Sequence, residues 1–226
     1  MKMLLIVAGV IVMMCVIAFL AIARAGAYMK HQSRICIDME LWDKLSSWAK
    51  AIHENACAHG WHDEKKPDDH WLCMVMTEVA EAVEADRKGR RFTSENRQEY
   101  EMRLDAVGDS REVTITAYES CIKGTLEEEF ADIVIRILDF VYEKYGEAMT
   151  WSPKAMISHH HHSSFTESAF RLVRLMTYAA TPEVLSMIVL YMYDWADCLG
   201  VDLDYHIVAK MKYNECRPYK HNNKKY

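Results

Sequence analysis

Two pairs of acidic residues, each with members three positions apart, have the spacing best suited to chemistry. Glu78 and Glu81 form one pair, and Glu129 and Asp132 form the other. Residues three apart share a face of an α-helix, so each pair presents two carboxylates together. Two such helices packed side by side can surround one or two divalent cations. All-oxygen ligands favour Mg²⁺ or Mn²⁺, and neither pair has the Glu-x-x-His spacing of a di-iron bundle.

The helix that carries the second pair is predicted to be buried on several sides. Its apolar residues recur at steps of three and four from Phe130 to Tyr145, and further isoleucines flank that stripe. The polar remainder is a narrow strip consisting of Glu129, Asp132, Arg136 and Asp139. Buried carboxylates need a cation or a metal as a partner. Two roles are possible for Asp139: its side chain reaches the same ligand, or it pairs with Arg136.

The start of this helix has a recognisable capping pattern. Lys123-Gly124 breaks the preceding pattern, Thr125 is suited to the N-cap, and Glu128 follows three residues later, which predicts a capping box. Glu127 lies favourably in the first turn. The capping box gives Glu128 a structural role and leaves Glu129 and Asp132 for a ligand.

Composition favours an all-α domain over residues 38–226. The 226 residues include only 8 glycines and 4 prolines, while Met, Ala, Leu and Glu are common. Periodicity predicts helices over 38–59, 70–87, 96–104, 112–123, 126–145, 164–178, 182–199 and 202–216. In the second of these, Asp68 or Asp69 is the expected cap and Leu72, Met76, Val79 and Val83 form the expected core stripe. No chemistry is assigned to residues 89–124.

The C-terminal helix carries polar residues on one face. Lys210, Asn214 and Arg217 fall at helical spacing before Pro218 ends the helix, and this arrangement suits a polyphosphate. A solvated basic terminus is the alternative. Trp61, in the turn after the first helix, could stack on a nucleotide base or pack in the core.

The N-terminus contains an apolar run from Met3 to Ala23, about the ~20 residues that a helix needs to span a bilayer. It is longer than the roughly 7–15 apolar residues of a signal peptide. The basic residues that follow it are Arg24, Lys30 and Arg34. They predict an anchor over residues 1–28 with the folded domain in the cytoplasm. The alternative is that translation starts at Met29, which would give a soluble cytoplasmic protein.

Cysteine and histidine usage suggests no further built site. The seven cysteines are odd in number and form no CxxC pair, which indicates reduced thiols in the core and a reducing compartment. The run His159–His162 is read as a surface loop with incidental metal affinity. A net charge of -6 gives no reason to expect nucleic-acid binding.

Taken in order, these motifs resemble a known signature. Glu78-Val79-Ala80-Glu81, then Glu129-Phe130-Ala131-Asp132, then Lys210-x3-Asn214-x2-Arg217 resemble the ExxE, ExxD and KxxxNxxR motifs of the MazG-like all-α nucleoside triphosphate pyrophosphohydrolases. The resemblance covers the chain from Leu41 to Tyr226. The acid pairs lie further apart than is usual in that family, and an N-terminal membrane segment is unusual there.

The resemblance implies an all-α multi-helix bundle, usually oligomeric, that hydrolyses a nucleoside triphosphate to the monophosphate and pyrophosphate. It implies that the four acids hold Mg²⁺ and take part in catalysis, and that the Lys-Asn-Arg face binds phosphate. A rival hypothesis is a non-catalytic, membrane-tethered module that binds a nucleotide or a metal. Nucleic-acid binding through the basic tail is a weaker hypothesis, because the tail lacks a recognised module.

Overall fold

Helix α6 (Leu126–Tyr145) is the most deeply buried element of this computed structural model, which describes residues 39–107, 110–152, 164–178 and 181–220. Burial covers most of the helix circumference, since apolar side chains from Phe130 to Val141 and three glutamates are shielded from solvent. The prediction of a helix buried on several sides is therefore confirmed. The described residues form helices joined by turns and loops, without strands, as expected for an all-α protein.

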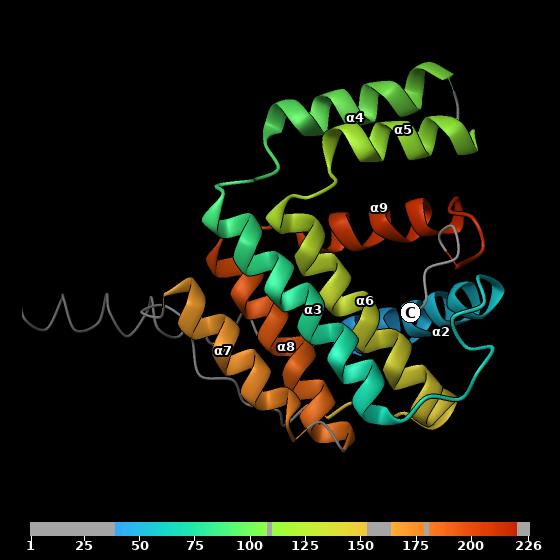
Figure 1. The fold of residues 1–226 in the computed structure, drawn as a ribbon, viewed down its shortest axis with the longest axis vertical. Helices are drawn as coiled ribbons and strands as arrows, with labels where there is room; N and C mark the ends of the chain where they lie inside the picture. The colour runs from blue at the N-terminus through green and yellow to red at the C-terminus, as the bar shows by residue number, and fades with distance from the viewer. Residues whose placement is uncertain (1–38, 108–109, 153–163, 179–180, 221–226) are drawn as a thin grey trace, which may run out of the picture. The chain divides into compact units, whose positions relative to one another are not determined.

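Helix α6 packs against several neighbouring helices in the main bundle (Figure 1). Helix α3 (Asp68–Arg87) packs along α6, and α8 (Pro182–Cys198) packs on α6 as well. Helix α7 (Phe165–Met176) fills the space between α3 and α8. Aromatic contacts join the layers, with the rings of Phe130 and Trp195 centred 4.7 Å apart. The bundle thus fixes the two acid-bearing helices against each other.

The buried face of α3 differs from the predicted stripe. The residues Leu72, Met76 and Val83 are only half-buried, whereas Trp71, Val75, Glu78, Val79, Ala82 and Ala85 are buried. The reason is that α3 contacts α6 and α7, so its core face is wider than one stripe and includes Glu78. The predicted cap is also wrong: Pro67 occupies the N-cap position without a side-chain hydrogen bond, and the two aspartates lie in the first turn.

The described part of residues 89–124 contains a pair of packed helices, called the hairpin below. Helices α4 (Ser94–Val107) and α5 (Arg111–Cys121) pack together, and α5 contacts α9 (Leu203–Glu215) (Figure 1). A small separate core lies here, in which the rings of Tyr118 and Tyr213 stack with centroids 4.3 Å apart. The loop before the hairpin is tied to α6, since Glu127 accepts hydrogen bonds from Arg91 Nε at 2.6 Å and Phe92 N at 2.7 Å.

The C-terminal segment returns to the end of α2 (Met39–Ala58). The chain divides into two units, Met1–Trp42 and Asp43–Tyr226, and all contacts described here lie within the second. Lys220 N donates a hydrogen bond to His59 O at 3.0 Å, and the Tyr219 ring lies against Gly60, whose φ is +80°. A short 3-10 turn (Gly146–Ala148) follows α6.

The predicted anchor, Met3–Ala23, lies outside the described residues, as do Met29 and the run His159–His162. In the part of the chain that the structure describes, no single helix is long and apolar enough to cross a membrane. Helices α8 and α9 meet that requirement only as a pair, with a bend of 113° between them.

The cysteines of the described ranges are free, but most are not core residues. Cys57, Cys73 and Cys198 are exposed, and Cys216 is partly buried. Cys121 alone among them is buried, in the core of the hairpin. The expectation of core thiols is therefore wrong for most of the described cysteines, because helix surfaces carry them.

Candidate functional site

Three of the four predicted metal ligands meet between α3 and α6. One carboxylate oxygen each from Glu78, Glu81 and Glu129 lies within 4.8 Å of the other two. Glu78 and Glu129 are 5% and 6% exposed, whereas Glu81 is exposed and leaves the cluster open to solvent on one side. Three carboxylates at this separation repel one another, so a cation between them would be favourable. We refer to these three residues as the acidic cluster.

Burial and mutual repulsion hold protons on this cluster. Burial, followed by the charges of Asp132, Glu128, Glu81 and Glu78, raises the pKa of Glu129 to about 9. Burial and the charge of Asp132 raise the pKa of Glu78 to about 7, although Arg136 donates a hydrogen bond to it and opposes the shift. Without a metal, the cluster therefore carries less than its full negative charge near neutral pH.

The fourth predicted ligand, Asp132, lies beside the cluster and forms an ion pair. Lys210 Nζ lies 2.6 Å from Asp132 Oδ2 and 2.6 Å from Glu128 Oε1. The lysine is 6% exposed. Burial opposes its charge, but the charges of Asp132 and Glu128 outweigh burial and raise the pKa of Lys210. Asp132 thus links the acidic cluster to α9.

The start of α6 shows half of the predicted capping box. Thr125 Oγ1 accepts a hydrogen bond from Glu128 N at 3.2 Å, as expected. The Glu128 carboxylate, however, accepts from Gly124 N, one residue before the position that a capping box requires. Its other oxygen faces Lys210. Glu128 therefore joins the cap to the lysine, a second role that the capping pattern alone did not reveal.

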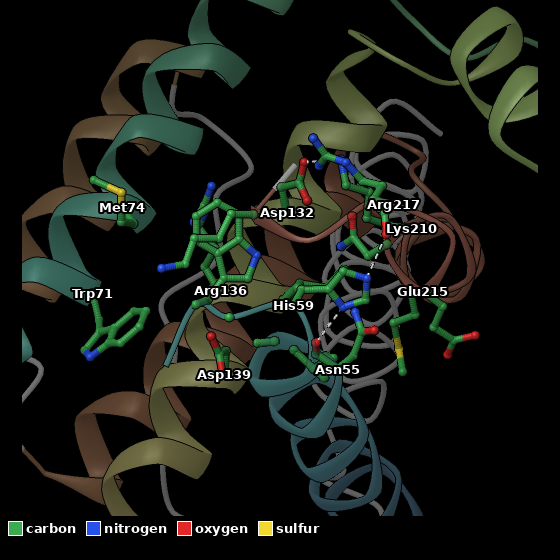
Figure 2. Close-up of a pocket in the computed structure, with 18 of the residues that line it drawn as sticks. Asn55, His59, Trp71, Met74, Asp132, Arg136, Asp139, Lys210, Glu215 and Arg217 are labelled. Carbon is green, nitrogen blue, oxygen red and sulfur yellow. Dashed lines mark hydrogen bonds and ion pairs between the residues drawn. The ribbon is translucent and has the colours of Figure 1, made fainter. Parts of the chain in front are cut away.

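A cavity of about 460 Å³ opens beside Asp132 and Arg136. In Figure 2, Trp71 and Met74 line one side from α3, while His59 and Asn55 face them from α2 and the turn after it. The four residues predicted to bind substrate all line this cavity: Lys210, Asn214, Arg217 and Trp61. None of the three glutamates of the acidic cluster lines it. Asp132 and Arg136 form the boundary between cluster and cavity.

Two polar groups in the cavity wall are available to a ligand. Asn214 Oδ1 is buried without a hydrogen-bond partner among the described residues. Arg217 forms no ion pair within those same ranges, and its guanidinium lies 5.4 Å from the centre of the Tyr213 ring. A buried amide oxygen and an unpaired guanidinium both gain from a bound polar ligand.

Asp139 lines the cavity but does not pair with Arg136, so the second of its two predicted roles is wrong. Arg136 pairs with Glu78, and Asp139 Oδ1 lies 2.9 Å from both His53 Nδ1 and His62 Nε2. Burial opposes the charge of Asp139, but the hydrogen bonds from both histidines outweigh it and lower its pKa. These two histidines come from separate elements, so spacing along the chain gave no signal for them.

Comparisons of the chain with protein-family models, with curated proteins and with solved structures find no match.

Proposed function

We propose that this protein is a Mg²⁺-dependent nucleoside triphosphate pyrophosphohydrolase. The observation that carries the proposal is the meeting of Glu78, Glu81 and Glu129 beside a cavity whose wall offers Arg217 and Asn214. An acidic cluster suits a divalent cation, and a neighbouring basic wall suits a polyphosphate. A cavity of about 460 Å³ is within the range of small-molecule sites.

The acidic cluster fits a hard divalent cation. Its ligands are all oxygen, they come from two helices locked together, and burial makes their negative charge unfavourable without a cation. Glu78, Glu81 and Glu129 would hold Mg²⁺, with Asp132 beside them. When bound, Mg²⁺ neutralises phosphate oxygens and lowers the pKa of a coordinated water.

The remaining roles belong to the chain itself. Arg217 holds the charge of the phosphates, and the Asn214 side-chain N–H groups donate to their oxygens from the same wall. Lys210 fixes Asp132 through their ion pair. Water attacks the α-phosphorus, a carboxylate of the acidic cluster accepts the proton, the bond to the bridging oxygen breaks, and pyrophosphate leaves. Trp61 and Trp71, which line the cavity, would pack against the base.

The finer assignment rests on the sequence. Membership of the MazG-like family, assembly into homo-oligomers and use of Mn²⁺ in place of Mg²⁺ are supported by the resemblance of the three motifs. Attachment of a cytoplasmic domain to a membrane is supported by the apolar run Met3–Ala23 and the basic residues after it.

The proposal is tested by screening canonical and modified nucleoside triphosphates with Mg²⁺ and measuring pyrophosphate and monophosphate release. Glu81→Gln, Glu129→Gln and Asp132→Asn should each reduce kcat/KM by about 100-fold or more, because they remove charge from the metal site. The matched control is Glu84→Gln, which makes the same change on α3 at a half-buried residue that lies outside the cluster and pairs with Lys88.

The control variant should retain normal turnover. Full activity in Glu81→Gln or Asp132→Asn would contradict the proposal, and so would the absence of pyrophosphate release from every triphosphate. Circular dichroism of each variant establishes that loss of activity is not loss of fold.

One observation favours a second candidate, a non-catalytic nucleotide- or metal-binding module. Lys210 is already engaged by Glu128 and Asp132, so its charge is partly neutralised before any phosphate arrives. Saturable binding of a nucleotide in Mg²⁺ without turnover would support this module over the enzyme.

A further inference from the structure

A second cluster of metal-binding side chains lies about three helical turns along α6 from Glu129. It combines two imidazoles with a carboxylate, His53 from α2, His62 from the loop after α2, and Asp139 from α6. A ligand atom from each lies within 4.8 Å of the other two. The acidic cluster shares none of these residues, so the nucleotide hydrolysis proposed above makes no use of them.

The donor atoms converge on one point. His53 Nδ1 and His62 Nε2 each lie 2.9 Å from Asp139 Oδ1. Ligands about 2.0–2.1 Å from a tetrahedral Zn²⁺ lie roughly 3.3 Å apart, so side-chain shifts of a few tenths of an ångström would admit the ion. The three side chains are 15%, 7% and 14% exposed, which restricts competition from water.

Packing fixes both imidazole rings. The His62 ring stacks on Trp71 with centroids 4.5 Å apart, and it meets the His53 ring edge-on at 4.4 Å. Site geometry is therefore set by aromatic contacts and does not depend on the ion.

The second ring nitrogen of each histidine lies near an acidic or sulfur atom. Glu143 Oε2 lies 3.4 Å from His62 Nδ1 and 3.8 Å from His53 Nε2. Cys57 Sγ lies 3.4 Å from His53 Nε2. Metal-bound histidines commonly direct their second nitrogen toward a carboxylate, which fixes the tautomer and strengthens the ligand. The surroundings of the rings thus match those of metal-ligating histidines.

We propose that His53, His62 and Asp139 bind a divalent transition metal of the Zn²⁺ or Co²⁺ type. Imidazole nitrogen favours these ions, whereas Mg²⁺ prefers oxygen ligands. The bound ion joins α2, the loop after it and α6, and so stabilises one wall of the cavity.

The test is a titration of the full chain with Co²⁺, followed by its visible d–d absorption, with Mg²⁺ in excess to occupy the acidic cluster. A run of four histidines is expected to bind metals incidentally, so the run His159–His162 is removed from the background. His159→Ser, His160→Ser, His161→Ser and His162→Ser are therefore introduced together. In this background we expect saturable Co²⁺ binding at one equivalent, displaced by Zn²⁺.

Loss of a residue that only hydrogen-bonds to a metal-binding side chain weakens metal binding by ~10- to 100-fold. Removal of one of the metal-binding side chains should weaken Co²⁺ binding by at least as much. We expect this result for His62→Gln and for Asp139→Asn. His70→Gln is the matched control, because His70 lines the same cavity but lies outside the cluster. Glu129→Gln should bind Co²⁺ normally, which separates this site from the acidic cluster even if that cluster proves to have no catalytic role.

A second readout does not depend on absorption. Zn²⁺ should raise the Tm of the background protein and of His70→Gln, but not that of Asp139→Asn, with EDTA reversing the effect. Absence of saturable Co²⁺ binding in the background protein would overturn the proposal, as would unchanged affinity in both ligand variants. Melting curves in EDTA show whether each variant is folded.

Discussion

At the scale of single residues, the acidic cluster destabilises the folded protein when no metal is bound. Glu129 is buried among Glu78, Glu81 and Asp132, and Arg136 is a direct cationic partner only for Glu78. Burial of a carboxylate in this way lowers the free energy of unfolding, and the packing of α3 on α6 must offset that loss.

Removal of the Glu129 charge should therefore stabilise the metal-free protein. In the folded protein the pKa of Glu129 is about 9, above the ordinary value of 4.5, so the folded state holds the proton more tightly than the unfolded state. The free energy of unfolding therefore falls as the pH rises from 4.5 to about 9. Glu129→Gln should gain about 1–3 kcal/mol over wild type at about pH 8 in EDTA, measured by urea denaturation. Mg²⁺ should stabilise only the wild type. Equal stability of the two proteins in EDTA would contradict this account, and Glu84→Gln, outside the cluster, serves as control.

His206 should make the free energy of unfolding depend on pH in the direction opposite to that of Glu129. It is 2% exposed, its Nδ1 has no hydrogen-bond partner in the described ranges, and burial lowers its pKa to about 4. The unfolded state therefore binds the proton more tightly, and stability falls as pH drops from about 6.5 toward 4.

His206→Gln cannot titrate and should remove on the order of 3 kcal/mol from that acid-induced loss. Urea denaturation of both proteins across this pH range measures the difference. If both lose stability with the same slope, titration of His206 is not the cause.

At the scale of elements, local sequence patterns predicted the helices well and their contacts less well. Periodicity located every described helix within a few residues, because alternating steps of three and four apolar residues are a local property. The pairing of Glu128 with Lys210, and of Asp139 with His53 and His62, depends on helices far apart in sequence. The buried position of Glu78 was missed for the same reason, since Glu78 lies against α6, where Arg136 donates a hydrogen bond to it.

The turn that closes the cavity should depend on Gly60. Its φ of +80° disfavours any side chain, and an added Cβ would lie 2.4 Å from the ring of Tyr219. Gly89 has a similar φ of +64° with open space around it, so Gly89→Ala isolates the backbone cost of about 1–3 kcal/mol. Gly60→Ala should cost more in urea denaturation, because Tyr219 must move and lose its hydrogen bond to Asp63.

A second substitution identifies the cause of that difference. In a protein that already carries Tyr219→Ala, Gly60→Ala should lower the free energy of unfolding only as much as Gly89→Ala lowers it in the wild type. Equal costs for the two single glycine variants would show that the ring moves aside freely.

At the scale of the whole described unit, Lys210 joins three parts of the structure. Its ammonium contacts Glu128 and Asp132 on α6 and lies 5.5 Å from the ring centres of both Tyr118 and Tyr213. One buried cation thus connects the bundle, α9 and the α4–α5 hairpin.

Loss of this cation should uncouple the hairpin from the bundle. Lys210→Met leaves the buried Glu128 carboxylate and the partly buried Asp132 carboxylate without their partner and should cost about 3–5 kcal/mol. Hydrogen exchange should rise in α4 and α5 before it rises in α3 and α6. Lys212→Met, on the exposed side of the same helix, should change neither quantity. Uniform exchange across all helices would argue against a connecting role for Lys210.

The polar strip along α6 also limits which insertions and deletions this helix can tolerate. Its four members Glu129, Asp132, Arg136 and Asp139, and Glu143 after them, recur at alternating steps of three and four. Insertion of one residue between Asp132 and Asp139 would turn the rest of the helix by about 100° and remove Asp139 from its two histidines. Substitutions in this stretch can be accommodated one side chain at a time, whereas insertions and deletions cannot.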